Sequence, residues 1–556
     1  MASDNPSTSI AVIGAGPGGL AAAMLLAGRG LSVTIYEAAP VVGGRTSRVS
    51  LGDFHFDRGP TFFLMPYVLE EVFAATGRRL RDYADLTRLD PMYRLVVGQR
   101  EAAPITLDTT QGVAEMARRV GAIDARDGER FESFMHEHRR KLAAFTPVLR
   151  KGFSGLRDLL DTNLLKAGPW LNPHRSVHSL LGRTFRNPAT RLALSFQSKY
   201  LGMSPYNCPS LFTILPFIEY EYGIWHPRGG CNALMQGMAR ACEEMGVVIR
   251  TDAPVEGIEF EGSRAVGVRV AGVVHRHEQV VINADAAWAL KNLIPESLRQ
   301  TAAGGAALGI HFGASPPYTD ARLDKLKYSC STFMLYLGLR TKLDLPHHTI
   351  CVSSRYDENL ADIGEGRLSD DPSFYICNPS RTDPTLAPAG CSSLYVLVPT
   401  PNCREGAGID WREAVPHLRA AALARIRGLT GLDIEPHIAC EQVTTPRDWQ
   451  AGNIQFGATF NLAHGLDQML HLRPRHEVPG MEGVWLVGGG THPGSGLPVI
   501  FLSAQITARK LCAKLGVADP LIPRPAPAAL PCEHALERLS EGFVEPTLTP
   551  AAQVPA

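Results

Sequence analysis

The chain has 556 residues, too many for one compact core, so two or three domains are expected. Its composition, with 45% hydrophobic and 20% charged residues, is that of an ordinary globular protein. Lysine plus arginine and aspartate plus glutamate each number 55, so the formal net charge is zero and no overall field favours nucleic acid as a partner.

The first informative stretch runs from residue 10 to residue 37 and is typical of a strand, a glycine-rich turn, a helix and a second strand. Gly14, Gly16 and Gly19 have the G-x-G-x-x-G spacing of a dinucleotide-binding turn. These glycines permit a tight turn, the approach of a pyrophosphate and close packing of helix on strand. Glu37 ends the second strand, where its carboxylate can bind an adenosine ribose and disfavours a 2′-phosphate. We therefore expect FAD or NAD rather than NADP.

A second glycine motif favours FAD. Gly43, Gly44 and Arg45 follow shortly after Glu37. They resemble the extended fingerprint of the glutathione-reductase-like FAD enzymes, which the amine-oxidase and phytoene-desaturase branches share. The resemblance implies that Gly44 and Arg45 bind the cofactor.

The next motif narrows the resemblance to the phytoene-desaturase family. Residues 57–61 read D-R-G-P-T, which suits a turn and resembles the family's D-x-G-P-T element. Family structures imply that Pro60 and Thr61 lie near the flavin. Residues 89–94, L-D-P-M-Y-R, resemble a further element of these enzymes, in particular of the C30, diapophytoene-type branch.

Residues 110–222 change character, because helical periodicity dominates them. We expect an inserted helical domain that faces the substrate or a membrane. His136 and His138 lie among charges with no third ligand at metal spacing, which indicates a solvated face and no metal site. The apolar segment 211–225, which contains Glu219, is compatible with a tunnel lining, a lipid-facing surface or buried core, and the sequence leaves these alternatives open.

Residues 223–290 indicate a return to the cofactor domain. A helix is expected over residues 232–245 and a strand over residues 247–250. Val255 follows that strand, and the resemblance to FAD enzymes implies that its backbone contacts the adenine. Residues 255–286 are typical of a β-meander of short strands.

Residues 291–480 are typical of mixed strands and helices, with strands expected at 328–339 and 392–398. After Asp519 the chain is rich in proline and alanine. Such a composition cannot bury much apolar surface, so disorder is expected there.

The C-terminal cofactor segment is a strand that enters a glycine turn, followed by residues 491–498, T-H-P-G-S-G-L-P, and a helix to Leu515. This run resembles the bacterial-type carotenoid desaturases. In the superfamily the helix start faces the pyrimidine edge of the flavin, where the helix dipole stabilises negative charge. The resemblance implies four further cofactor-binding residues: Gly490, Thr491, Gly496 and Leu497.

Two details of this segment bear on the chemistry. The Asp that usually follows the glycine in the wider FAD class is replaced by Gly490, a departure that the carotenoid branch shares. His492 is a candidate acid or base near the cofactor, and the alternative is that Thr-His-Pro only shapes the turn. No other catalytic residue is predicted.

Together these motifs predict an α/β fold: a glutathione-reductase-like Rossmann FAD-binding domain, a discontinuous mixed α+β substrate domain and a helical insertion. The FAD-binding domain is expected to comprise residues 1–109, 223–290 and 481–518. The helical insertion is expected at 110–222, the substrate-binding domain at 291–480 and the Pro/Ala-rich tail at 519–556.

The resemblance implies an FAD-dependent desaturase that introduces conjugated double bonds into a membrane-held C30 or C40 carotenoid precursor by hydride transfer to flavin. Because a single dinucleotide fingerprint is present, reoxidation by quinone or oxygen is expected rather than by bound nicotinamide. Alternatives are a carotenoid terminal-methyl oxidase or oxygenase on the same scaffold, and a non-catalytic isoprenoid-binding flavoprotein. An amine oxidase is less favoured, because T-H-P-G-S-G departs from that branch.

The cellular setting is predicted from three absences in the sequence. The eleven cysteines form no C-x-x-C pair, which indicates reduced thiols. The first nine residues lack the regions of a signal peptide, and no apolar run of about 18 residues occurs. We therefore expect a cytoplasmic protein in peripheral contact with a membrane.

Overall fold

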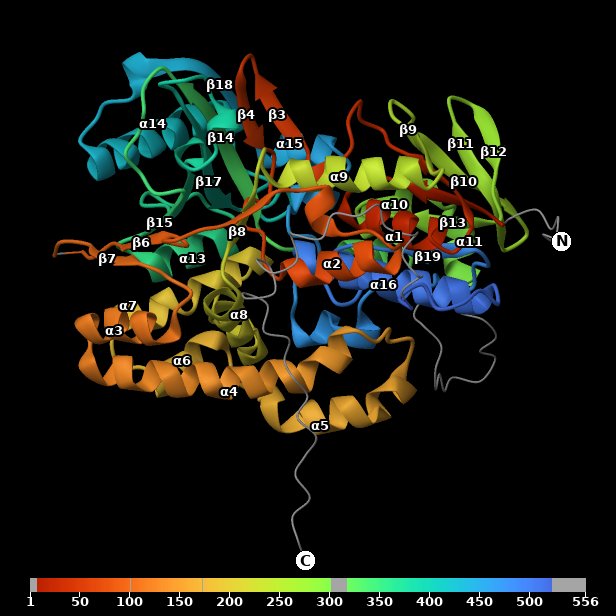
Figure 1. Ribbon diagram of the computed structural model, residues 1–556, viewed down its shortest axis with the longest axis horizontal. Helices are drawn as coiled ribbons and strands as arrows, with labels where there is room; N and C mark the ends of the chain where they lie inside the picture. Colours follow the sequence, from red (N-terminus) through yellow and green to blue (C-terminus); the bar gives the residue numbers. More distant parts are fainter. Residues whose placement is uncertain (1–7, 101, 173, 302–317, 523–556) are drawn as a thin grey trace, which may run out of the picture.

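The computed structural model describes residues 8–100, 102–172, 174–301 and 318–522. Two β-sheets lie side by side, and a layer of helices covers their lower edge in Figure 1. Most of the tail predicted at 519–556 falls outside the described residues.

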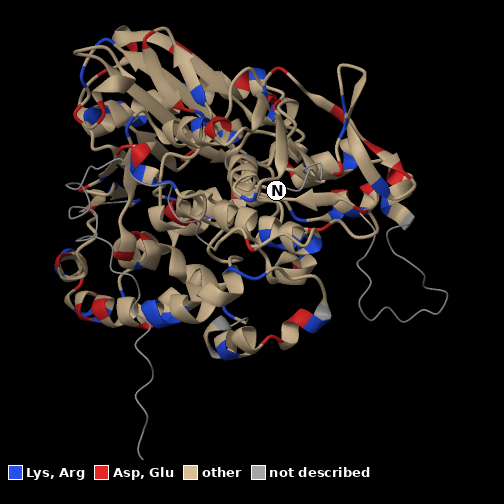
Figure 2. Cartoon of the chain, turned by 45° about the vertical axis from the view of Figure 1, so that its right-hand side comes forward, with Lys and Arg blue, Asp and Glu red and all other residues tan. Residues whose placement is uncertain are grey.

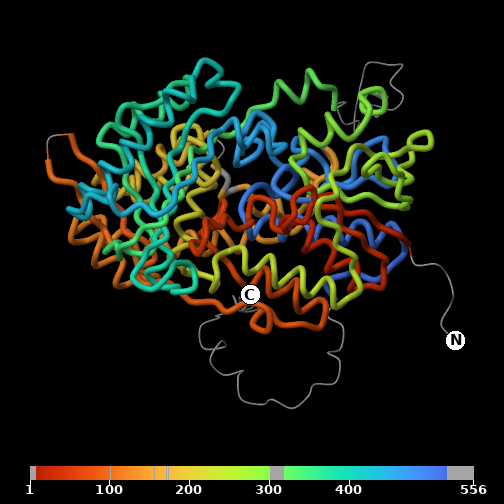
Figure 3. Tube along the Cα trace, turned by 90° about the horizontal axis from the view of Figure 1, so that it is seen from above, coloured from red at the N-terminus to blue at the C-terminus, as the bar shows by residue number. Residues whose placement is uncertain are grey.

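The first sheet has five parallel strands in the order β19-β13-β1-β2-β9. Its strands come from three separate parts of the chain, which Figure 3 shows as red, yellow-green and blue segments in one half of the molecule. The parallel Rossmann-like core predicted from the sequence is confirmed. The strands are β1 (Ser9–Ile13), β2 (Ser32–Tyr36), β9 (Val248–Arg250), β13 (Gln279–Ile282) and β19 (Val484–Leu486).

Helix α1 (Pro17–Ala27) is buried on nearly every side, which explains its run of alanine and leucine. It packs between α9 (Cys231–Glu244) and α16 (Leu497–Lys514). Because α1 follows β1 directly, this packing brings the last helix of the chain to the first glycine turn.

A separate three-stranded antiparallel sheet packs on the first sheet and consists of β10 (Val255–Glu261), β11 (Arg264–Val270) and β12 (Val273–Arg276). The expected meander is therefore correct for these three strands. It is wrong for the last one, since β13 leaves the meander and pairs in parallel with β1 and β19. All four residues of β13 are buried, as suits a central parallel strand.

The second sheet has seven strands in the order β18-β14-β17-β16-β15-β6-β7. Strands β6 and β7 lie within residues 1–109, the first segment predicted for the FAD-binding domain. They nevertheless belong to the second sheet, because β6 pairs in parallel with β15. Helix α14 (Trp411–Thr430) covers one face of the sheet. The strands are β6 (Arg94–Val97), β7 (Ile105–Asp108), β14 (Ser331–Leu339), β15 (His348–Val352), β16 (Phe374–Cys377), β17 (Ser392–Thr400) and β18 (Ile438–Thr444).

The helical layer occupies the range predicted for the helical insertion and contains α3 (Val113–Ile123), α4 (Ala125–Leu149), α5 (Thr162–Leu171), α6 (Val177–Thr184), α7 (Pro188–Ala193) and α8 (Ile214–Tyr222). Asp124 caps α4 by accepting hydrogen bonds from the backbone N–H groups of Arg126 and Asp127. Figure 2 shows basic and acidic residues interspersed along the outer helices.

The expectation of a solvated face at His138 is wrong. The ring is 1% exposed, and its nitrogens contact the Phe134 carbonyl oxygen at 2.8 Å and the Thr213 hydroxyl at 2.7 Å. Burial lowers the pKa of His138 to about 3. His138 is therefore a neutral core residue that joins α4 to the start of α8.

The remaining elements connect these layers. No helix in the described ranges is long and apolar enough to cross a bilayer. The ten cysteines within those ranges are free thiols. The connecting elements are β3 (Arg48–Leu51), β4 (Phe54–Asp57), α2 (Pro66–Ala75), β5 (Leu86–Arg88), β8 (Trp225–Pro227), α10 (Ala286–Leu293), α11 (Glu296–Thr301), α12 (Asp320–Lys325), α13 (Tyr356–Gly364) and α15 (Pro446–Ala451).

Candidate functional site

The first glycine turn is packed so closely that its glycines cannot be replaced. Gly14 has a φ of +95°, which favours glycine. A Cβ at Gly19 would overlap the carbonyl oxygen of Gly14, and one at Gly16 would lie 3.0 Å from the amide nitrogen of Asn283. The Asn283 side chain donates a 3.1 Å hydrogen bond to the Gly14 carbonyl oxygen. The sequence prediction did not assign this role to Asn283.

Glu37 is held against the same turn. One carboxylate oxygen accepts a 2.7 Å hydrogen bond from the backbone N–H of Ala15, and the other accepts a 2.9 Å bond from the N–H of Ala39. The Glu37 backbone oxygen also accepts from Ala253, two residues before Val255, the predicted adenine contact. The contact of Glu37 with a ribose and that of Val255 with an adenine stay predictions.

The second glycine motif lies beside the first. The backbone N–H of Gly43 donates a 2.9 Å hydrogen bond to the Ala15 carbonyl oxygen, and a Cβ at Gly44 would lie 3.5 Å from the Cα of Gly16. The Arg45 guanidinium donates to the carbonyl oxygen of Thr459 at 2.7 Å and to the side-chain oxygen of Asn461 at 3.0 Å.

The charge of Arg45 is partly compensated within the fold. Burial lowers the pKa of Arg45, and the nearby Asp285 carboxylate opposes that shift. Gly59 packs against the second glycine motif, because a Cβ at Gly59 would lie 2.5 Å from the Arg45 carbonyl oxygen. Pro60, a predicted flavin contact, is the next residue in the chain.

The C-terminal turn closes onto the first turn. A Cβ at Gly18 would lie 3.4 Å from the Cα of Gly488 and 3.2 Å from the Ile500 side chain on α16. Helix α16 begins after Gly496, which has a φ of +117°, and no side chain caps its N-terminal N–H groups. Leu497 is 4% exposed at the first position of this helix.

Arg473 is a structural residue of this turn that sequence reasoning missed. It is 2% exposed, and its guanidinium donates to the carbonyl oxygens of Gly489 at 2.8 Å and Thr491 at 3.2 Å. The Thr491 hydroxyl in turn donates a 2.5 Å hydrogen bond to the Pro474 carbonyl oxygen. Gly490 packs against Ala286, where a Cβ would overlap. Burial lowers the pKa of Arg473 to about 10, so it remains a cation at neutral pH.

His492 has the surroundings of a packing residue. Its Nε2 contacts the Val148 carbonyl oxygen at 3.2 Å, and its ring meets Phe153 edge-on at a centroid distance of 5.1 Å. Burial lowers the pKa of His492 to about 4. These contacts join the C-terminal turn to the helical layer, and they favour the interpretation that Thr-His-Pro shapes the turn.

Thr61 begins a chain of hydrogen bonds that leads into the second sheet. Its hydroxyl lies 2.6 Å from the Tyr375 hydroxyl, which lies 2.7 Å from Nδ1 of His348. The Phe62 ring stacks on the His348 ring at a centroid distance of 4.2 Å. Thr61 therefore lies against the second sheet, and the adjacent Phe62 also contacts Tyr200 of the helical layer.

A buried carboxyl group lies next to Phe62. Glu219 on α8 is 0% exposed, and one of its oxygens accepts hydrogen bonds from the Tyr93 hydroxyl at 3.1 Å and the Gln197 amide at 3.0 Å. Phe62 contacts the rings of Tyr93 and Tyr200. Burial raises the pKa of Glu219 to about 7, against the effect of these hydrogen bonds. Glu219 therefore lies in the interior and not on a lipid-facing surface, and for this part of segment 211–225 buried core and tunnel lining both stay predictions.

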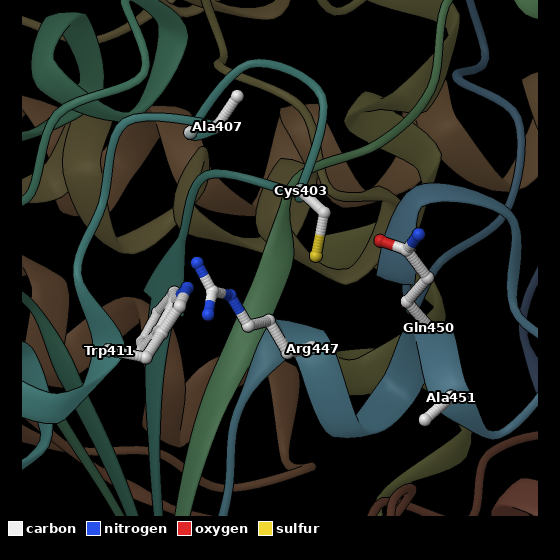
Figure 4. A pocket seen from close by; sticks show the side chains of 7 residues that line it. Cys403, Ala407, Trp411, Arg447, Gln450 and Ala451 are labelled. Carbon is white, nitrogen blue, oxygen red and sulfur yellow. The ribbon is translucent and has the colours of Figure 1, made fainter.

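A surface pocket of about 520 Å³ lies elsewhere, at α15 and the start of α14 (Figure 4). In Figure 4 the Arg447 guanidinium extends toward Trp411, and the Cys403 sulfur points between Arg447 and Gln450. Burial raises the pKa of the Cys403 thiol to about 11, which makes it a weak nucleophile at neutral pH. The pocket contains none of the predicted site residues. Its lining residues are Cys403, Gly406, Ala407, Trp411, Arg447, Gln450 and Ala451.

The geometry fits an FAD. Two glycine turns pack closely together where a Cβ would not fit, and α1 and α16 both begin without a side-chain cap. Such helix starts bind phosphates and stabilise negative charge. The class that fold and site define is an FAD-dependent oxidoreductase.

The sequence profile of the family described as "Flavin containing amine oxidoreductase" matches residues 17–316, and the chain belongs to this family. Curated relatives match it over most of their length. A protein from Methylomonas sp. named 4,4'-diapophytoene desaturase (4,4'-diapolycopene-forming) is 42% identical over 91% of this chain and 95% of its own. A Myxococcus xanthus protein named all-trans-zeta-carotene desaturase is 38% identical over 93% and 96%. A Staphylococcus aureus 4,4'-diapophytoene desaturase is 31% identical over 90% and 98%.

Solved structures share the fold. A putrescine oxidase aligns with a TM-score of 0.57 at 14% identity, over 92% of this chain and all of its own. Cyclohexylamine oxidase from Brevibacterium oxydans aligns with a TM-score of 0.55 at 15% identity over the same shares. At such identities the likeness concerns the fold alone.

Proposed function

We propose that the protein is an FAD-dependent carotenoid desaturase that acts on CH–CH bonds of a C30 or C40 precursor of the phytoene or diapophytoene type. The observation that carries this proposal is the 42% identity, over nearly the whole chain, to a protein named as a diapophytoene desaturase. When bound, FAD supplies the hydride acceptor for such a reaction. The protein has to orient the chain, exclude water and take up a proton.

Glu219 is our candidate for the group that takes up the proton. Desaturation removes a hydride from one carbon and a proton from its neighbour, and the two electrons of the second C–H bond form the new double bond. Glu219 is buried, its pKa is near 7, and the side chains of Tyr93, Gln197 and Tyr200 surround its carboxyl group. A carboxyl group with such a pKa can accept a proton at neutral pH. Aromatic rings around it, including Tyr93 and Phe62, suit an apolar chain.

We further propose that the protein contacts a membrane through the segment that leads into α5. Leu160 and Leu165 are 75% and 61% exposed, and the basic residues Arg157 and Lys166 flank them. Exposed apolar side chains beside basic ones favour binding to an anionic lipid surface. In Figure 1 this segment lies at the outer edge of the helical layer. Membrane-held substrate, and reoxidation by quinone or oxygen, agree with such a contact.

Pigment analysis of a host that makes the carotenoid precursors tests the proposal. Expression of the chain is expected to convert the precursor into hydrocarbons with additional conjugated double bonds, detected by HPLC and mass spectrometry. Products that carry aldehyde or keto groups would instead identify a terminal-methyl oxidase. An unchanged precursor beside correctly folded flavoprotein would favour the non-catalytic isoprenoid-binding protein.

A further inference from the structure

Two adjacent histidines and a cysteine lie together in the interior, on the face of the second sheet opposite to α14. His347 and His348 are 3% and 0% exposed, and Cys377 is 1% exposed. His348 begins β15 and lies directly opposite Cys377 in the antiparallel pair that β15 forms with β16. The strand register therefore holds an imidazole and a thiol side by side.

The donor atoms of these three side chains converge. Ring nitrogens of both histidines and the sulfur of Cys377 lie within 4.8 Å of one another. A tetrahedral zinc site, with bonds of about 2.0–2.3 Å, needs its donor atoms roughly 3.5 Å apart. Side-chain rotations that bring these atoms about 1 Å closer would place three of the four donor atoms of such a site.

The hydrogen bonds of the two rings leave one nitrogen of each unused. Nδ1 of His347 contacts the Thr382 hydroxyl at 2.5 Å, and Nδ1 of His348 contacts the Tyr375 hydroxyl at 2.7 Å. Nε2 of each ring is buried without a partner. The Thr382 hydroxyl donates its own proton to the Pro379 carbonyl oxygen, so Nδ1 of His347 carries the proton and its Nε2 presents a lone pair.

In histidines that bind a metal, one ring nitrogen is typically held by an oxygen while the other binds the ion, and each ring here has one nitrogen held and one without a partner. Two imidazoles and a thiolate are ligands that Zn²⁺ prefers. The surroundings also offset a positive charge, because Asp57 lies within electrostatic reach of Cys377 and buried Asp383 lies 3.0 Å from the neighbouring His226. We propose that His347, His348 and Cys377 form a Zn²⁺ site.

The metal would join the segment before β15 to β16 and would fix His348, whose Nδ1 holds Tyr375 and, through it, Thr61. Its role is thus to position the segment of Thr61. The inference goes beyond the proposed carotenoid chemistry and does not depend on it.

Zinc titration of the full-length flavoprotein, after treatment with a chelator that leaves FAD in place, tests the proposal. Competition with a chromophoric chelator is expected to show one Zn²⁺ per chain for the wild type. Cys377→Ala should bind Zn²⁺ at least about a hundredfold more weakly. Loss of a residue that only hydrogen-bonds to a metal ligand can already weaken metal binding by up to about a hundredfold, and loss of a ligand itself should weaken it at least as much. Cys351→Ala is the matched control, since Cys351 is an equally buried thiol on β15 that packs with the α14 face, and it should bind like the wild type.

Cobalt provides a second measurement on the unaltered protein. Co²⁺ in this site is expected to give a thiolate-to-cobalt charge-transfer band and the visible spectrum of a tetrahedral ion. Equal zinc binding by the wild type and Cys377→Ala, or no binding by the wild type, would overturn the proposal. So would a cobalt complex without the thiolate band, which decides the question even where Cys377→Ala fails to fold.

Discussion

The hydroxyl of Tyr93 donates a 3.1 Å hydrogen bond to the carboxylate of Glu219, 126 residues further along the chain. Tyr93 immediately precedes β6 of the second sheet, and Glu219 lies on α8 of the helical layer. Both side chains are fully buried. This contact therefore joins the second sheet to the helical layer. Burial raises the pKa of the Glu219 carboxyl group to about 7, so this group changes its protonation within the physiological pH range.

The stability of the wild type should depend on the charge of Glu219. Burial raises its pKa from 4.5 to about 7, so the folded state holds the proton more tightly than the unfolded chain. Proton binding by Glu219 therefore adds roughly 3 kcal/mol to the free energy of unfolding at low pH. This stabilisation is complete below pH 4.5 and is lost as the pH rises through about 7. Glu219→Gln should lack this loss. Urea unfolding of both proteins from pH 4.5 to pH 8, the range set by these pKa values, measures the difference.

Activity should follow the same group. If Glu219 takes up the substrate proton, the wild-type rate rises with pH around a midpoint near 7, and Glu219→Gln is at least about a hundredfold slower. Glu221→Gln is the matched control, because Glu221 is on the same helix but pairs with Arg139 near the surface. An unchanged rate and midpoint in Glu219→Gln would rule out this role.

Flavin retention should depend on the first glycine turn. Gly16→Val places a branched side chain where even a Cβ lies 3.0 Å from Asn283, in the space expected for the pyrophosphate. The purified variant should be colourless. Gly182→Ala on α6 serves as control, since nothing lies within 4 Å of a Cβ there. A yellow Gly16→Val protein would contradict the assigned cofactor position.

His492→Gln should remain an active flavoprotein. A glutamine amide can still donate to the Val148 carbonyl oxygen, so we expect a loss of stability of about 1 kcal/mol and a rate within a few-fold of the wild type. Because the pKa of His492 is about 4, the pH profile above pH 5 should be unaltered. A drop in rate of a hundredfold at normal flavin content would restore His492 as an acid or base.

Membrane binding should depend on the two exposed leucines. Leu160→Glu combined with Leu165→Glu removes apolar surface worth about 1.5–3 kcal/mol per side chain on burial, so binding to anionic vesicles should weaken at least tenfold. Flotation with phosphatidylglycerol-containing vesicles measures this. Val273→Glu with Val274→Glu is the control, since these apolar residues on β12 are also exposed, at 57% and 43%, and lie remote from the helical layer in Figure 1. Equal weakening by both pairs would contradict the assigned surface.

The sequence predicted β1, β2, β9 and β19 of the first sheet because each of these short strands lies close to a glycine, whereas the meander pattern placed β13 wrongly. Gly14, Gly16 and Gly19 follow β1 as the motif requires, and the last helix begins one residue before the expected Pro498. The second sheet was less predictable, since pairing of β6 with β15 joins segments about 250 residues apart and no local pattern records it. The assignment of residues to cofactor contacts stays a prediction.

The burial of His138 and the structural role of Arg473 were not predicted from the sequence, and the reasons differ. His138 continues an apolar stripe on α4 with Phe131, Phe134 and Leu142, and this spacing indicated burial more strongly than the flanking charges indicated solvent. Arg473 offered no such signal. It lies in an irregular segment and binds carbonyl groups of Gly489 and Thr491, a function that only the folded backbone defines.

Anaerobic mixing of the purified flavoprotein with a dispersed carotenoid precursor tests the central claim most directly. We predict that the visible absorption of oxidised flavin disappears while the precursor gains a conjugated double bond, one for each flavin reduced. Flavin that stays oxidised beside an unchanged phytoene or diapophytoene would contradict the assignment of this chain as a carotenoid desaturase.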